Sequence, residues 1–349
     1  MLNQPPSLVA DDGQITWDPL LSPSTQHGVT TVMFGNCGVG FAPCRPDSRD
    51  KLIEVLEGAQ KKSWPLWSYT CTPRLIRSAA GVEDIPGSAL HEGIQWSWES
   101  FPEYLDALAE TSTACDFVVL LPHVPLRVYT MGDRCDEAPT QEDLDNMREI
   151  VAEAMAAGAV GMSTSRTLLH RDLNGTVIPG TYADRAELTA LMAGMADGGG
   201  GLFEILEDFA DLDVEQDWLG KLSRNFGIPV SFAFGAGSKA RQLEFNEFLD
   251  RVNADADGYE YVTGQTSIKN QGSLQNLKSK YHPFVGHPTF ERELAHLSYE
   301  EKLSAMRQPE MRAQLLSEES FFADKPFSQI IFANDNLYGK HSSSRPAWL

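Results

Sequence analysis

The sequence DFVVLLPHVPLRVYTMGDRCDEAPTQEDLDNMREIVAEAMAAGAVGMSTS (Asp116–Ser165) holds two short apolar runs with an amphipathic stretch between them. The runs, Asp116–His123 and Ala159–Ser165, are continuous rather than alternating, as expected of strands buried on both faces of a sheet. Between them Thr140–Asp143 is similar to a capping box, apolar residues follow at three- and four-residue spacing, and Gly158 ends the stretch. This order of strand, helix and strand predicts a parallel sheet.

The same alternation extends over most of the chain. The predicted strands are Gly28–Gly35, Asp116–His123, Ala159–Ser165, Gly201–Leu206, Ile228–Gly235 and Tyr259–Gln265. Besides the helix that begins at Thr140, helices are predicted at Asp184–Met195, Val214–Phe226, Ala240–Val252, Tyr299–Met306 and Pro309–Glu318. Six such strands fit an α/β fold, either an open doubly wound sheet or an incomplete barrel.

Composition narrows the function classes. The 349 residues include 28 Lys and Arg against 49 Asp and Glu, a formal net charge of −21. Long-range repulsion therefore disfavours nucleic acid and anionic membrane surfaces as partners. The five scattered cysteines, the lack of a basic segment before His27 and the lack of a long apolar run predict a cytoplasmic protein. The segment Gly35–Gly40 (GNCGVG) lacks the spacing of a dinucleotide-binding loop.

In α/β folds, functional groups collect just past the carboxyl ends of the strands. The first predicted strand ends on Gly35–Gly38 (GNCG), the second on His123, and the third on Ser163–Arg166. Cys37 is a candidate metal ligand or nucleophile. The alternative is a small buried side chain in a turn, since free cysteine is among the most buried residue types.

Four other residues are candidates. Glu204 lies between Phe203 and Ile205, so it is either paired, protonated or bound to a cation, or the strand turns it toward solvent. His123 is a candidate for a metal or a substrate carbonyl, with a structural role as the alternative. Arg127 and Arg166 are candidates for binding a substrate carboxylate, with local ion pairs as the alternative.

Other notable side chains are predicted to be structural. His170 is expected to be a solvated loop residue, and His282 and His287, among prolines, are not spaced as a helical metal pair. The segment between Trp64 and Trp98 is rich in proline and tryptophan and interrupts the alternation. Its tryptophans are expected to pack in the core rather than to form the wall of an apolar substrate pocket.

The stretch GQITWDPLLSPSTQHGVTTVMFGNCGVGFAPCRP (Gly13–Pro46) resembles the N-acyl-D-amino-acid deacylase (D-aminoacylase) branch of the amidohydrolase superfamily. The resemblance continues in Leu121–Gly132, Ala154–Thr167 and Val177–Leu188. It implies a (β/α)8 barrel of the TIM type that uses a divalent metal, most often zinc, to hydrolyse the amide of an N-acylated D-amino acid. It also implies that Cys37 is a metal ligand and that Glu204 takes the place of another ligand.

The sequence also departs from the family pattern. Ser7–Pro19 (SLVADDGQITWDP) lacks the His-x-His pair that the family carries there, and no Ser-Asp block with the catalytic aspartate is present. The resemblance therefore implies an incomplete barrel, in which the six predicted strands are the second to seventh. Residues 1–27 would replace the small β domain and first strand, 28–320 would form the partial barrel with an insertion near 61–100, and 321–349 would be a tail.

These observations predict a metal-dependent deacylase of N-acyl-D-amino acids with weakened activity. Cys37 and Glu204 would bind the metal, His123, Arg127, Ser165 and Arg166 would bind the substrate, and no catalytic residue is assigned. The alternative is a non-catalytic protein that binds a small molecule or completes its barrel with a second chain. A cyclic amidase similar to dihydroorotase or hydantoinase fits less well, because it would also need the His-x-His pair.

Overall fold

The structure is a computed structural model of the chain. It describes residues 14–16, 18–22, 24–56, 87–167, 170, 172, 176–207, 212–233, 243, 246–248, 250, 262–265, 277, 284 and 287–318. The chain divides into two compact units, the first formed by residues 1–59 and 79–272 and the second by residues 60–78 and 273–349. The predicted division at residues 27 and 320 stays a prediction.

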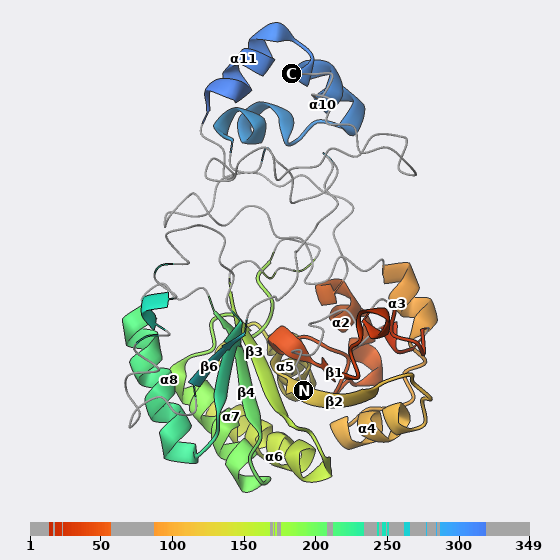
Figure 1. Cartoon of the computed structure of the whole chain (residues 1–349), viewed down its shortest axis with the longest axis vertical. Coiled ribbons are helices and arrows are strands. Elements are labelled where there is room, and N and C mark those ends of the chain that lie inside the picture. Colours follow the sequence, from red (N-terminus) through yellow and green to blue (C-terminus); the bar gives the residue numbers. More distant parts are fainter. Residues whose placement is uncertain are drawn as a thin grey trace. The chain divides into compact units, whose positions relative to one another are not determined.

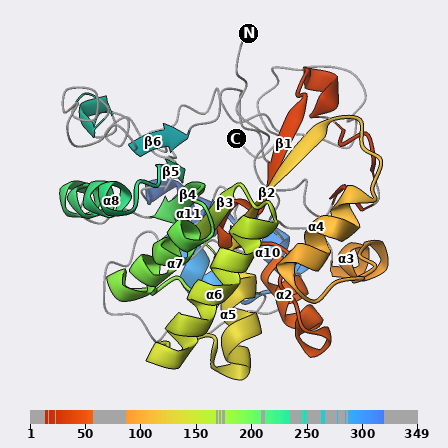
Figure 2. The ribbon, with the colours of Figure 1, turned by 90° about the horizontal axis from the view of Figure 1, so that it is seen from below.

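The first unit contains a curled parallel sheet of six strands, whose curved succession from β1 to β6 can be followed in Figure 2. The strands are β1 (Thr31–Phe34), β2 (Asp116–Pro122), β3 (Gly161–Arg166), β4 (Leu202–Glu207), β5 (Val230–Ala233) and β6 (Val262–Gln265). Each strand pairs with the next one in the chain, in the order β1 to β6. A doubly wound sheet would reverse its strand order, so the described residues form a six-stranded part of a barrel. The predicted incomplete TIM-type barrel is confirmed.

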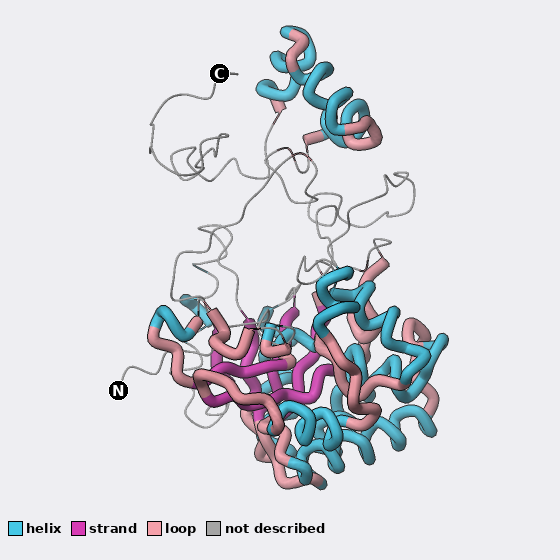
Figure 3. Tube along the Cα trace, turned by 90° about the vertical axis from the view of Figure 1, so that its right-hand side faces the viewer, coloured by secondary structure: helices cyan, strands magenta, loops and turns pink. Residues whose placement is uncertain are grey.

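Helices line the sheet of this unit (Figures 1 and 3). They are α2 (Arg49–Leu56), α3 (Gly87–Gly93), α4 (Phe101–Ala109), α5 (His123–Met131), α6 (Gln141–Ala157), α7 (Arg185–Asp197) and α8 (Leu212–Phe226). Short 3-10 turns are η1 (Thr25–His27), η2 (Asn36–Gly38), η3 (Pro46–Ser48) and η4 (Gly132–Arg134). The helix predicted at Ala240–Val252 lies largely outside the described residues.

Helix α6 forms as the sequence predicts. The Thr140 side chain accepts a hydrogen bond from the Asp143 N–H, and the Asp143 carboxylate accepts one from the Thr140 N–H in return. At the other end, Gly158 adopts a left-handed conformation with φ of 117°. These two caps satisfy backbone groups that the helix leaves unpaired, and they fix both ends of the helix.

Helix α5 differs from the prediction, because the strand β2 ends at Pro122 and His123 begins a helix. Pro125 lies in its first turn, where a missing N–H costs no intrahelical hydrogen bond. The residue before the helix sequence HVPLRVYTM is Pro122, which has no polar side chain to cap the helix. Without a cap signal, the apolar run predicts a strand that continues through His123, and the start of α5 is not predicted. His123 is therefore held by a helix rather than by a strand end.

The core of this unit lies on both sides of the sheet, and its largest fully buried side chains include Phe34, Phe203 and Phe232. Trp98 is also buried and donates a hydrogen bond from Nε1 to the carbonyl of Phe41 at 2.9 Å. This confirms core packing for Trp98, whereas Trp64 and Trp67 lie outside the described residues.

The described part of the second unit contains a π-helical turn η5 (Phe290–Leu294) and the helices α10 (Tyr299–Met306) and α11 (Pro309–Ser317). Phe290, Leu294 and Leu315 form a small buried cluster of their own. The helices predicted for this segment are confirmed. Across the described residues of both units, the helices are too short or too polar to traverse a bilayer.

Candidate functional site

The turn η2, which follows β1, is fixed by close packing. Gly35 and Gly38 have φ of 79° and 74°, and a Cβ on Gly35 would lie 2.2 Å from the carbonyl oxygen of Leu120. Ser163 on β3 binds both glycines: its hydroxyl donates to the Gly35 carbonyl and accepts from the Gly38 N–H at 2.9 Å. The turn is therefore anchored to the neighbouring strands through its backbone.

Glu204 on β4 reaches this turn. The Cys37 N–H donates to Glu204 Oε2 at 2.9 Å, and the Glu204 side chain is fully buried. Its other oxygen, Oε1, is buried and has no hydrogen-bond partner among the described residues. Burial raises the pKa of Glu204 to about 8, although the Cys37 N–H acts to lower it. The alternative in which the strand turns Glu204 to solvent is wrong.

Cys37 and Glu204 carry groups that suit a metal ion. A cysteine thiol and a carboxylate are both zinc ligands, and the unpartnered Glu204 Oε1 is what a buried ligand oxygen would leave behind in metal-free protein. Among the described residues, however, no group of three His, Cys, Asp or Glu side chains is placed to hold a metal. Cys37 and Glu204 therefore fit a metal as two ligands of a set that the described residues do not complete.

His123 and Arg127 lie together around a residue that the sequence analysis did not select, Glu187 on α7. His123 Nε2 lies 3.0 Å from Glu187 Oε1, and Arg127 forms an ion pair with the same oxygen. Arg127 also donates from Nε to the carbonyl of Cys135 at 2.9 Å. All three side chains of this buried triad, His123, Arg127 and Glu187, are at most 4% exposed.

Within the buried triad, the surroundings of Glu187 favour its ionised form. Burial acts to raise the pKa of Glu187, but the hydrogen bond and charge of His123 and the charge of Arg127 outweigh it, so this pKa lies below its usual value. On its other ring nitrogen, His123 Nδ1 lies 2.8 Å from the Thr164 hydroxyl on β3. The triad therefore connects α5 and α7 to the sheet. In the sequence, Asp184-x-x-Glu187 is the pattern of a helix start, which already gives Glu187 a local role. The pattern therefore does not predict the long-range contact of Glu187 with His123 and Arg127.

Ser165 and Arg166, at the end of β3, have separate partners. The Ser165 hydroxyl lies 2.9 Å from His170 Nδ1, so His170, predicted to be a solvated loop residue, has a protein partner and stays partly exposed. Arg166 forms ion pairs with Glu207 at 3.1 Å and with Glu215 at 3.3 Å, and its side chain stays 18% exposed. The structure thus places Arg166 in the local ion pairs named as its alternative.

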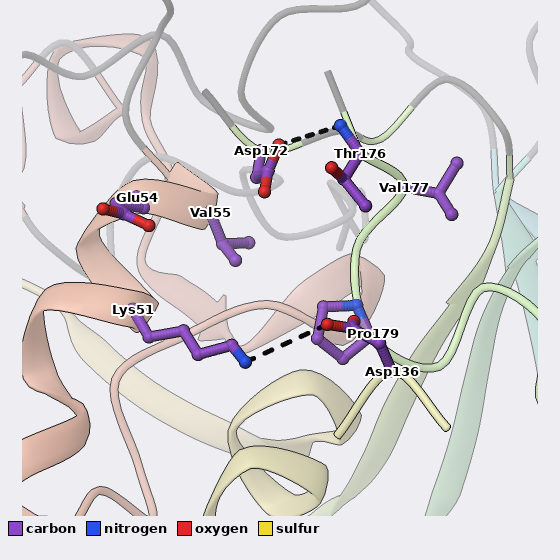
Figure 4. A pocket seen from close by; sticks show the side chains of 8 residues that line it. All are labelled: Lys51, Glu54, Val55, Asp136, Asp172, Thr176, Val177 and Pro179. Atoms are coloured by element: carbon purple, nitrogen blue, oxygen red, sulfur yellow. Dashed lines mark hydrogen bonds and ion pairs between the residues drawn. The ribbon is translucent and has the colours of Figure 1, made fainter. Parts of the chain in front are cut away.

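Two further features involve other residues. Figure 4 shows a hollow lined by Lys51, Glu54, Val55, Asp136, Asp172, Thr176, Val177 and Pro179, which includes none of the predicted site residues. In the second unit, His287 is buried 3.6 Å from Glu318, and burial lowers the pKa of its ring. His282 lies outside the described residues.

Comparison with known proteins relates the chain to one family. Residues 11–320 match the sequence profile of the amidohydrolase family. A D-aminoacylase of Alcaligenes xylosoxydans xylosoxydans is 25% identical over 275 residues, which are 76% of this chain and 47% of that protein. An N-acyl-D-aspartate deacylase of the same organism is 32% identical over 154 residues, or 44% of this chain and 24% of that protein.

Solved structures give similar results. A crystal structure of D-aminoacylase is 21% identical with a TM-score of 0.49, and the match covers 74% of this chain and 46% of that one. An N-acyl-D-glutamate deacylase from Bordetella bronchiseptica, solved with zinc and a phosphonate inhibitor, is 22% identical with a TM-score of 0.46. The chain spans less than half the length of these relatives. Because the family profile matches most of its residues, the chain belongs to the amidohydrolase family.

Proposed function

We propose that this chain binds N-acyl-D-amino acids and hydrolyses their amide bond with the help of a divalent metal, most often zinc in the family it resembles. The observation that carries the proposal is the contact between Cys37, in the turn after β1, and Glu204 within β4, with Glu204 Oε1 buried and without a partner among the described residues. Relatives that match this chain include a D-aminoacylase and an N-acyl-D-aspartate deacylase. Their names support the substrate class.

Cys37 and Glu204 would hold the metal, through the thiolate sulfur and Oε1. When bound, such an ion supplies a Lewis acid for the amide carbonyl and for a water molecule. Glu204 must lose its proton to act as a ligand, and its pKa of about 8 means that metal and proton compete for it. Metal binding at this site should therefore be weaker at pH 6 than at pH 8.

Four residues were predicted to bind the substrate, and we assign them different tasks. Arg127 uses its guanidinium on Glu187 and on two backbone carbonyls, so it would hold Glu187 in place, while His123 would link Glu187 to Thr164. The Arg166 side chain is partly exposed to solvent. Arg166 is the last residue of β3 and follows Ser165. We therefore assign the substrate carboxylate to Arg166, with Ser165 next to it.

The deciding experiment combines activity with metal content. Purified chain with added zinc should hydrolyse N-acetyl-D-methionine weakly, and the Cys37→Ala variant should lose both the activity and the bound zinc. A Cys115→Ala variant, which changes another buried cysteine, should keep both. Hydrolysis that survives Cys37→Ala would contradict the assignment of the metal site.

A second function is favoured by the small number of metal ligands. Among the described residues no three His, Cys, Asp or Glu side chains are placed to hold a metal, whereas a hydrolytic zinc site uses three protein ligands. Without a complete metal site, the chain would bind an N-acyl-D-amino acid but would not hydrolyse it. In the same experiment, it would show no zinc and no product, yet calorimetry would detect binding of N-acetyl-D-methionine.

A further inference from the structure

Asn36, the first residue of η2, is a polar side chain whose burial the fold does not explain. It is 1% exposed, and neither Oδ1 nor Nδ2 has a hydrogen-bond partner among the described residues. A buried amide that makes no hydrogen bond costs stability, because it loses its contacts with water and gains none in return. Core packing therefore does not explain why an asparagine occupies this position, and a ligand that binds its amide group would.

The usual structural reason does not apply to Asn36. Asparagine in a turn normally uses its side chain to bind nearby backbone groups. In η2 those groups already have other partners: Ser163 takes the Gly35 carbonyl and the Gly38 N–H, and Glu204 takes the Cys37 N–H. The Asn36 carbonyl in turn accepts from the Val39 N–H at 3.3 Å. The turn is thus held without the Asn36 amide.

The position of Asn36 supplies a second argument. It precedes Cys37, whose N–H binds Glu204, and Glu204 Oε1 is the other unpartnered polar atom beside this turn. Two side chains, one within β4 and one in the turn at the carboxyl end of β1, therefore carry three unsatisfied polar atoms. The carboxyl ends of the strands, which the turn η2 follows at β1, are where barrels of this type bind their ligands.

We propose that the Asn36 side chain binds the amide group of the substrate, an inference that rests on the proposed function. A secondary amide has one acceptor, its carbonyl oxygen, and one donor, its N–H. The C=O and N–H of a trans amide point in opposite directions, so Asn36 binds the N–H through Oδ1 and an oxygen of the carboxylate on the same amino acid through Nδ2. This pairing satisfies both Asn36 atoms when substrate is bound and makes Asn36 a substrate-binding residue.

The test compares two ligands on three proteins by isothermal titration calorimetry. The first ligand is N-acetyl-D-methionine, and the second is its ester analogue, in which oxygen replaces the amide N–H. The wild type should bind the amide about tenfold more tightly than the ester, because only the amide can donate to Oδ1. Asn36→Leu should bind the amide about ten- to a hundredfold more weakly than the wild type and should lose the preference.

Thermal unfolding separates this role from a structural one. Leucine has the same branching and number of side-chain heavy atoms as asparagine and removes two unsatisfied polar atoms, so Asn36→Leu should keep or raise the melting temperature. Asn36→Ala provides a second variant that cannot clash. Asn146→Leu, at an exposed position on α6, is the matched control and should bind both ligands as the wild type does.

Each outcome has a distinct meaning. If both Asn36 variants bind the amide as tightly as the wild type, the role of Asn36 is overturned while the proposed function stands. If both variants lose binding and also unfold at a clearly lower temperature than Asn146→Leu, Asn36 holds the turn and the inference is overturned. If the wild type binds neither ligand, the proposed function itself fails.

Discussion

At the scale of single residues, the site contrasts two buried carboxylates. Glu187 is surrounded by His123 and Arg127, and its pKa is lowered. Glu204 receives only the Cys37 N–H, and its pKa is raised to about 8. The same side chain thus has opposite protonation at neutral pH, because one site supplies positive charge and the other does not.

The raised pKa of Glu204 predicts a pH-dependent stability. The unfolded chain releases this proton near pH 4.5 and the folded chain retains it until about pH 8, so the contribution of Glu204 to folding falls as pH rises through that window. Glu204→Gln removes the titrating group and keeps its shape. In metal-free protein, this variant should gain stability over the wild type at pH 8, by a few kcal/mol in order of magnitude, and little at pH 5.

Urea unfolding at the two pH values, with a chelator present, measures this effect. Glu149→Gln, at an exposed position on α6, should show no such difference between the two pH values. If Glu204→Gln and the wild type have equal free energies of unfolding at pH 8, ionisation of Glu204 does not destabilise the folded chain, and the prediction is wrong.

At the scale of elements, the buried triad joins α5, α7 and β3. Glu187→Gln would leave the buried Arg127 guanidinium without its ion-pair partner. Breaking a buried pair in this way costs about 3–5 kcal/mol. Chemical denaturation should show that loss, whereas Glu153→Gln on the exposed face of α6 should stay within about 0.5 kcal/mol of the wild type. A small loss for Glu187→Gln would show that Arg127 finds other partners.

The elements also show what the sequence can and cannot reveal. Continuous apolar runs locate the strands, and three- and four-residue spacing with caps locates α6 and α7, because these signals are local. Helix α5 was missed because its start has no polar cap. Glu187 was missed because its partner His123 lies 64 positions away, and no local pattern reports that contact. Cys37 and Glu204 were selected, but their role as metal ligands stays a prediction.

At the scale of the whole molecule, the net charge of −21 opposes an anionic substrate. Salt screens that repulsion, so N-acetyl-D-methionine should bind somewhat more tightly at 200 mM than at 20 mM salt. The neutral N-acetyl-D-methioninamide should show no such trend in the same calorimetric titration. Weaker binding of the carboxylate at high salt would mean that Arg166 or a metal dominates the attraction.

The strand order has a consequence for how the sheet is made. Each strand from β2 to β6 pairs with the strand that precedes it in the chain. A strand leaving the ribosome therefore finds its template already synthesised, and the sheet can grow from β1 toward β6 during translation. Such vectorial growth avoids long waits for distant partners, because each new strand adds to the edge that formed last.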